Sequence, residues 1–151
     1  MSAYRYTLHR QWSEAHFTLP IIMLNPSTAD ETEDDPTIRR CVEFATRDGF
    51  GGIHVVNLFA IRATDPNELW DFLDPIGPEN DDHIGNMARA AAHFHVPVLC
   101  AWGAHPMAKD RQHDVLAMLM NVETVCLGRT AAGRPRHPLY LRSDTKTVRY
   151  P

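Results

Sequence analysis

The sequence predicts one α/β domain, residues 1–151, in which a mostly parallel four-stranded sheet lies between two layers of helices. Short, continuous apolar runs, such as IIML at residues 21–24, are typical of parallel strands buried on both faces. These runs alternate with longer segments whose apolar residues recur at helical spacing. A length of 151 residues, 44% of them hydrophobic, suits one domain with one core.

The expected elements follow one another without a linker or a repeat. An alternating, β-rich segment at residues 4–10 predicts a first strand. The expected central strands are residues 21–24, 53–60, 96–103 and 122–127. The expected helices are residues 36–48, 66–73, 80–95 and 108–120. The first helix has a clear start, because Asp35 suits an N-cap and Pro36 suits the first helical position. Residues 128–138, rich in Gly, Pro and Arg, predict a loop.

Composition excludes several classes of protein. The cysteines are few, odd in number and widely spaced: Cys41, Cys100 and Cys126. We therefore expect reduced thiols and no zinc, iron–sulfur cluster or other cofactor. No apolar run approaches the ~20 residues of a membrane span, so we expect no membrane association. Residues 1–6 lack the apolar core of a signal peptide, which predicts a cytoplasmic protein.

Positive charge is concentrated in the last third of the chain. The net charge is −4, yet residues 101–151 contain 8 of the 15 Lys and Arg and only 4 of the 19 Asp and Glu. The densest part of this region comprises Arg129, Arg134, Arg136, Arg142, Lys146 and Arg149. Such a cluster can contact the phosphates of a nucleic acid, although on charge alone a solvated basic surface is the commoner explanation.

Polar residues follow the ends of the expected strands, where ligands of parallel sheets bind. They are Asn25, Asn57, the WGAH segment at residues 102–105, and His137 in the loop that follows the last strand. We expect all four to converge on one cleft.

Each of these residues also has a simpler explanation. Asn25 before a proline can be a turn former, His105 a helix cap, and His137 an exposed loop histidine. Asn57 is harder to explain in this way. A buried amide without a hydrogen bond costs about 1–3 kcal/mol, so Asn57 either fixes a loop or contacts a ligand.

Four segments, in this order, resemble the signature segments of the uracil-DNA glycosylase superfamily. They are LNPS at residues 24–27, GIHVVN at 52–57, VLCAWGAH at 98–105 and HPLYL at 137–141. The resemblance covers about residues 21–142 and implies a uracil-DNA glycosylase-like fold. The chain also resembles a family known only as a domain of unknown function, which contains the segments LNPSTAD and PRHPLYL.

The resemblance implies roles for particular residues. The catalytic residues would be Asn25, which positions the attacking water, and His137, which stabilises the departing base. Base-binding residues would be Asn57, Pro26, Ser27 and a stacking ring from Phe44 or Phe59. DNA-binding residues would be Leu141 and Tyr140, which wedge into the duplex, and Arg134, Arg136 and Arg142, which contact phosphates.

The chain departs from the superfamily's pattern at three places, one of which is the base-stacking Phe, for which Phe44 and Phe59 are only candidates. Asn25 replaces the acid of the most active branch, and an amide orients water without taking its proton. A nearby acid, Asp30 or Asp35, is an alternative water activator. The Ser and Pro of the last motif are Leu139 and Tyr140, which weakens the implied phosphate contacts of that loop.

Taken together, these features predict a monomeric, monofunctional DNA glycosylase without a cofactor or an obligate protein partner. Its substrate would be a flipped-out pyrimidine. Ser27 stands where the uracil-specific branch has a bulky Tyr. We therefore expect a damaged or 5-modified pyrimidine, whose removal would serve DNA repair or antiviral defence. The alternatives are a non-catalytic binder of nucleotides or modified nucleic acid, and a hydrolase of free nucleosides.

Overall fold

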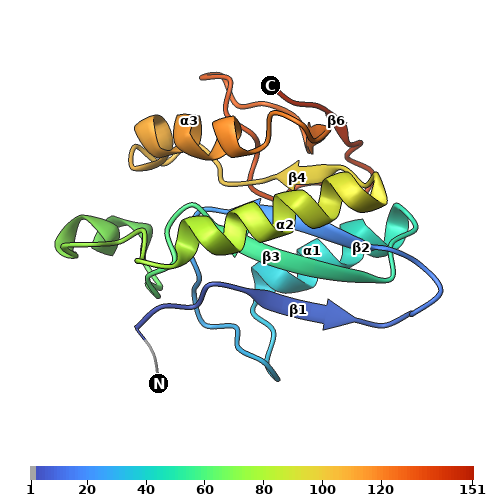
Figure 1. Ribbon diagram of the computed structural model, residues 1–151, viewed down its shortest axis with the longest axis horizontal. Helices are drawn as coiled ribbons and strands as arrows, with labels where there is room; N and C mark the ends of the chain where they lie inside the picture. The colour runs from blue at the N-terminus through green and yellow to red at the C-terminus, as the bar shows by residue number, and fades with distance from the viewer. Residues whose placement is uncertain (1–2) are drawn as a thin grey trace.

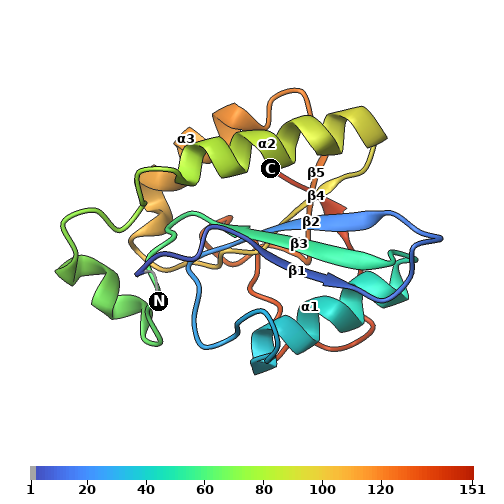
Figure 2. The same cartoon turned by 60° about the horizontal axis from the view of Figure 1, so that its bottom comes forward.

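The computed structural model describes residues 3–151, which form three layers. Figure 2 shows the sheet edge-on, with α1 (Pro36–Arg47) on one face and α2 (Asn80–Phe94) and α3 (Ala108–Met118) on the other. The predicted α/β class is therefore confirmed. The expectation about a signal peptide rests partly on Met1 and Ser2, which lie outside the described residues.

The sheet is mixed and has six strands in the order β1-β3-β2-β4-β5-β6. Its central strands are parallel: β3 (Gly52–Asn57), β2 (Thr18–Met23), β4 (Val98–Cys100) and β5 (Thr124–Cys126). An antiparallel strand borders each edge, β1 (Leu8–Gln11) beside β3 and β6 (Val148–Arg149) beside β5.

The predicted sheet of four strands is therefore too narrow. The strand β6 has two residues, both exposed, so no hydrophobic period marks it in the sequence. Only the pairing with β5 in the folded chain makes it a strand.

The helix α1 and a short 3₁₀ helix begin where local capping chemistry predicts, whereas α2 and α3 begin without a side-chain cap. Asp35 accepts a hydrogen bond from the backbone N–H of Ile38 (2.8 Å) and so caps α1. The segment Pro66–Asp71 is a short 3₁₀ helix, η1, with a capping box formed by Asp65 and Glu68. The helix α2 ends at His95, whose left-handed backbone (φ 55°) terminates the helical hydrogen bonds.

Strand alternation divides the core into two clusters, one on each face of the sheet. Ile53 and Val55 of β3 pack on the α1 side, whereas Val56 packs on the side of α2 and α3. Asn57 continues the alternation of Ile53 and Val55, at the carboxyl end of the strand. The fold thus places an amide at the end of an otherwise apolar strand face.

No helix in the described part of the chain is long and apolar enough to cross a membrane. The three cysteines are buried and form no disulfide. Within residues 3–151, no group of three or more His, Cys, Asp or Glu side chains is arranged to hold a metal ion.

Candidate functional site

A cavity of about 210 Å³ lies on the α1 side of the sheet, where β2 and β3 end. These carboxyl ends lie at the left of Figure 1. Five candidate site residues from the sequence line this cavity: Asn25, Ser27, Asp35, Asn57 and His137. They are up to 112 positions apart in the chain, and only the crossover topology brings them together. Met23, Val55 and Ile38 supply apolar walls.

Asn57 is the most unusual residue of this cavity. Its side chain is buried, and neither Nδ2 nor Oδ1 has a hydrogen-bond partner among the residues that the structure describes. Its backbone is firmly held, because the Asn80 side chain donates to the Asn57 carbonyl (2.9 Å) and Arg111 donates to the Leu58 carbonyl (3.0 Å). A buried amide of this kind needs a ligand or an ordered water to complete its hydrogen bonds.

His137 presents a defined tautomer to the cavity. Its Nδ1 accepts a hydrogen bond from the backbone N–H of Leu139 (3.1 Å), so the neutral ring has its proton on Nε2. Burial lowers the pKa of His137 below its ordinary value, and the Asp35 carboxylate partly opposes this effect. The imidazole is therefore neutral at pH 7, with Nε2–H as a hydrogen-bond donor.

The WGAH segment supports the His137 loop mainly through its backbone. Gly103 has a left-handed φ of 76°, and its N–H donates to the Pro135 carbonyl (2.9 Å). Trp102 is buried and bonds to Gln112 (3.2 Å). His105 lies outside the cavity, where its Nε2 is 3.0 Å from Oδ1 of Asn67. The expected convergence thus holds for Asn25, Asn57 and His137 but not for His105.

Asn25 has a structural role in addition to its place in the cavity. Its Nδ2 donates to the carbonyls of Pro26 (2.9 Å) and Ala63 (2.7 Å), which joins the loops that follow β2 and β3. These bonds fix the amide plane and leave Oδ1 as its acceptor. Pro26 is buried and contributes its carbonyl rather than a surface of the cavity.

Of the two acids considered as water activators, only Asp35 lines the cavity. Its carboxylate accepts hydrogen bonds from the N–H groups of Ile38 (2.8 Å) and Ala29 (3.3 Å). The Asp30 carboxylate instead accepts from the N–H groups of Thr32 and Glu33 and holds its own loop together.

The expectation of a stacking ring from Phe44 or Phe59 is corrected, because neither lines the cavity. Phe44 lies on the buried face of α1, with the guanidinium carbons of Arg40 and Arg47 at 4.7 and 5.0 Å from its ring centre. Phe59 is buried in the core on the opposite face of the sheet. Both were candidates because they are aromatic. Their packing in the hydrophobic cores accounts for an aromatic residue at each position.

The expected wedge is also corrected in part. Leu141 packs against the core on the α1 side, and its carbonyl accepts a hydrogen bond from Arg40. Tyr140 is instead 93% exposed, at a left-handed φ of 71°. It is therefore Tyr140 that projects from this loop.

The three arginines expected to contact phosphates have different surroundings. Arg136 is exposed, and Arg142 is exposed and paired with Asp144 (3.1 Å). Arg134 is partly buried, and its Nη1 is a buried atom without a hydrogen-bond partner within residues 3–151.

Arg5 is a lining residue that the sequence did not reveal. It is only 8% exposed, and its Nη1 donates to the Ala29 carbonyl (2.6 Å). In the alternating segment at residues 4–10, Arg5 lies on the same expected strand face as Thr7 and His9. This placement predicts a solvent-facing side chain. No local pattern could have revealed its burial.

Comparison with protein families finds one match over most of the chain. The model of a family described as "Protein of unknown function (DUF1643)" matches residues 5–139. This range contains every residue that lines the cavity, from Arg5 to Leu139. Neither the curated proteins nor the solved structures include a protein that matches this chain.

Proposed function

This chain belongs to the DUF1643 family, whose function is unknown, and we propose that it is a DNA glycosylase that hydrolyses the N-glycosidic bond of a flipped-out pyrimidine. The observation that carries the proposal is the buried Asn57 amide, which has no partner and shares a small cavity with the neutral His137 imidazole. The resemblance of four sequence segments to the uracil-DNA glycosylase superfamily points in the same direction.

Asn57 would recognise the edge of the base. Its amide offers one acceptor and two donors, a set that complements the alternating donors and acceptors of a pyrimidine. The cavity of about 210 Å³ is smaller than the ~300–1,000 Å³ typical of drug-sized ligands. It therefore suits a single base better than a whole nucleotide.

His137 would stabilise the charge that develops as the bond breaks. Departure of the base leaves an anion on the pyrimidine and an oxocarbenium-like sugar. A donor already oriented toward the position of that charge lowers the barrier by about 3–4 kcal/mol. The Leu139 N–H···Nδ1 bond holds the ring in the tautomer that this role requires.

Asn25 would hold the water that attacks the sugar. Its two Nδ2 bonds fix the amide plane, so Oδ1 can accept a hydrogen bond from water in one orientation. An amide takes no proton, so slow chemistry is expected. Asp35 is the nearest acid in the cavity and the alternative acceptor of that proton.

Contact with DNA would involve the loop that contains His137. Tyr140 is fully available to fill the gap left by a flipped base, and Arg136 and Arg142 are exposed near it in sequence. Binding through such arginines weakens as salt concentration rises.

The substrate would have a substituent at C5, for repair or for antiviral defence. Ser27 lines the cavity with a small side chain, which leaves room there. Ser27→Tyr should suppress release of 5-modified pyrimidines more than release of uracil. A wild-type protein that strongly prefers unmodified uracil would contradict this part of the proposal.

The decisive experiment incubates the purified protein with DNA duplexes and single strands that contain different bases, then cleaves abasic sites with alkali. We expect the wild-type protein to give strand cleavage in DNA that contains one particular base. We expect the His137→Ala variant to lose this cleavage. Asn57→Asp should change which base is released, because a carboxylate only accepts hydrogen bonds. DNA binding without base release would indicate the non-catalytic binder. Release from free nucleosides alone would indicate the nucleoside hydrolase.

A further inference from the structure

A second, larger cavity of about 630 Å³ adjoins the candidate site. It lies between β1 and the acidic segment that joins β2 to α1, which Figure 2 shows passing beside β1. Arg5 lines both cavities, so its guanidinium forms part of the wall between them. The proposed function uses no residue of the second cavity.

Three guanidinium groups and two carboxylates line this cavity: Arg5, Arg10, Arg62, Asp30 and Glu31. One of the three cations is already neutralised. Arg10 pairs with Asp34 (2.7 Å) and donates to several carbonyls of the acidic segment, including that of Glu33 (3.1 Å). Arg10 therefore holds the segment in place and is not available to a ligand.

The other two cations have no acidic partner. Within residues 3–151, neither Arg5 nor Arg62 forms an ion pair, and the Nε atom of each is buried without a hydrogen bond. Burial, and then the charge of Arg62, lower the pKa of Arg5 to about 10. A buried guanidinium without a counter-charge is strongly disfavoured, and a second one nearby adds repulsion.

The nearby carboxylates of Asp35 and Asp30 oppose the fall in the pKa of Arg5, but only in part. Oδ1 of Asp30 accepts from the N–H groups of Thr32 (2.9 Å) and Glu33 (2.8 Å) and from the Thr32 hydroxyl (3.3 Å). Glu31 is exposed. A bound anion would supply the missing counter-charge for both arginines.

We infer that this second cavity binds a phosphate group through Arg5 and Arg62. Guanidinium groups bind phosphate oxygens with paired, charge-assisted hydrogen bonds, and the Thr7 hydroxyl on the lining adds a neutral donor. Because Arg5 also borders the candidate site, a phosphate held here lies next to any group bound at Asn57 and His137. If the proposed function holds, that phosphate belongs to the nucleotide whose base enters the site; otherwise it is free phosphate.

The first test uses inorganic phosphate, titrated by calorimetry at constant ionic strength with chloride as the balancing anion. Wild-type protein should bind phosphate saturably, and Arg62→Met should weaken binding at least tenfold. Arg62 is the better position to change, because Arg5 is more deeply buried and its substitution disturbs the Ala29 contact. Arg62→Lys should retain part of the affinity, since it keeps the charge but loses the fork of donors.

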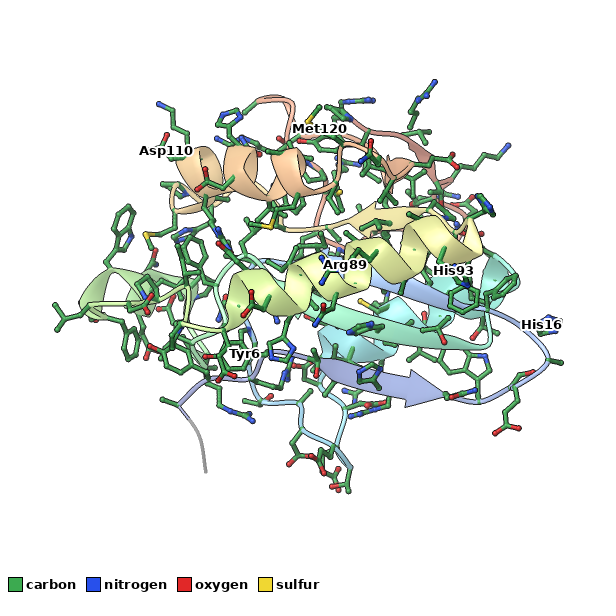
Figure 3. The ribbon with its side chains drawn as sticks, in the orientation of Figure 1. Tyr6, His16, Arg89, His93, Asp110 and Met120 are labelled. Carbon is green, nitrogen blue, oxygen red and sulfur yellow. The ribbon has the colours of Figure 1, made fainter. Side chains whose placement is uncertain are left out.

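Arg89→Met is the matched control, because Arg89 is an exposed arginine on α2, on the other side of the sheet (Figure 3). It should bind phosphate as tightly as the wild type does. Circular dichroism and urea unfolding establish that each variant is folded. Absence of saturable phosphate binding, or equal affinity in folded Arg62→Met, would overturn the inference.

The second test identifies the source of the phosphate by comparing inorganic phosphate, deoxyuridine and deoxyuridine monophosphate. Tighter binding of the monophosphate than of either part, weakened by both Arg62→Met and Asn57→Leu, indicates one nucleotide that spans both cavities. Equal affinity for the monophosphate and for inorganic phosphate indicates a site for free phosphate. Base release from DNA is measured separately. Arg62-dependent phosphate binding without base release would therefore retain this inference and reject the glycosylase.

Discussion

The two ends of the parallel strands contain buried polar groups in very different surroundings. At the carboxyl ends, the Asn57 amide shares its cavity with Asn25, Asp35 and His137, which come from three further segments. At the amino ends, a groove of about 260 Å³ is lined by the half-buried His54, whose Nε2 atom is buried, and by apolar side chains of α2 and the segment before β2. His16 and His93 lie near this end of the sheet (Figure 3).

The contrast shows that an unpartnered polar atom is informative only together with its neighbours. Nε2 of His54 is buried without a partner, as are both amide atoms of Asn57. The His54 ring stacks on His9 (4.2 Å between ring centres), and burial, followed by the charges of His9 and His83, lowers its pKa to about 4. The groove around His54 is lined mainly by apolar side chains, so we expect His54 to affect stability and Asn57 to affect activity.

The largest expected effect is on activity at the carboxyl ends. His137→Ala should lower the single-turnover rate of base release about a hundredfold, because it removes one oriented donor to the developing anion. His105→Ala is the matched control, since His105 is also a loop histidine but bonds to Asn67 outside the cavity. Equal losses in the two variants would remove His137 from the mechanism.

The next largest effect is on the pH dependence of the free energy of unfolding, and it arises from His54 at the amino ends of the strands. The folded-state pKa of His54 is about 4, below its ordinary value of 6.5, so folding favours the neutral ring. This contribution is complete above pH 6.5 and is lost as pH falls toward 4. The loss of this contribution between pH 8 and pH 5 lowers the free energy of unfolding by about 2 kcal/mol. Urea unfolding of wild type and His54→Leu at both values measures it.

His54→Leu should be less sensitive to acid by that amount and should release base at the wild-type rate. An identical pH dependence in the two proteins would show that His54 titrates normally. A loss of base release would show that the groove takes part in activity.

A smaller effect is expected at Asn25. Asn25→Ala should lower base release about tenfold, through loss of an oriented water, and should lower the free energy of unfolding by about 1–2 kcal/mol, through loss of the two Nδ2 bonds. Asn67→Ala, which changes an exposed asparagine outside the cavity, is the control for both measurements. A loss of stability without a loss of rate would assign Asn25 to structure alone.

The smallest expected effect is on stability at Asn57. Because the Asn57 amide has no partner to lose, Asn57→Leu should leave the free energy of unfolding unchanged or raise it by about 1 kcal/mol. Thermal unfolding of the variant beside His54→Leu compares the two ends of β3 directly. A loss of 2 kcal/mol or more would mean that Asn57 holds the fold together.

The sequence by itself determined the α/β class and the positions of most elements. Apolar runs marked the four parallel strands, and capping residues such as Asp35 marked helix starts, because strand burial and helix capping depend on side chains close together in the chain. The sequence also indicated Asn25, Asn57 and His137, since polar residues at the carboxyl ends of parallel strands face a common edge.

Only the tertiary structure decided which of the indicated side chains face the cavity. Phe44 and Phe59 fill the cores, His105 bonds elsewhere, and Leu141 packs inward while Tyr140 projects. The tertiary structure alone revealed β6, whose two exposed residues have no pattern, and the pair of cations formed by the buried Arg5 and the half-buried Arg62. Such features depend on contacts between segments more than twenty residues apart, and no local periodicity encodes which distant group will lie opposite a given side chain.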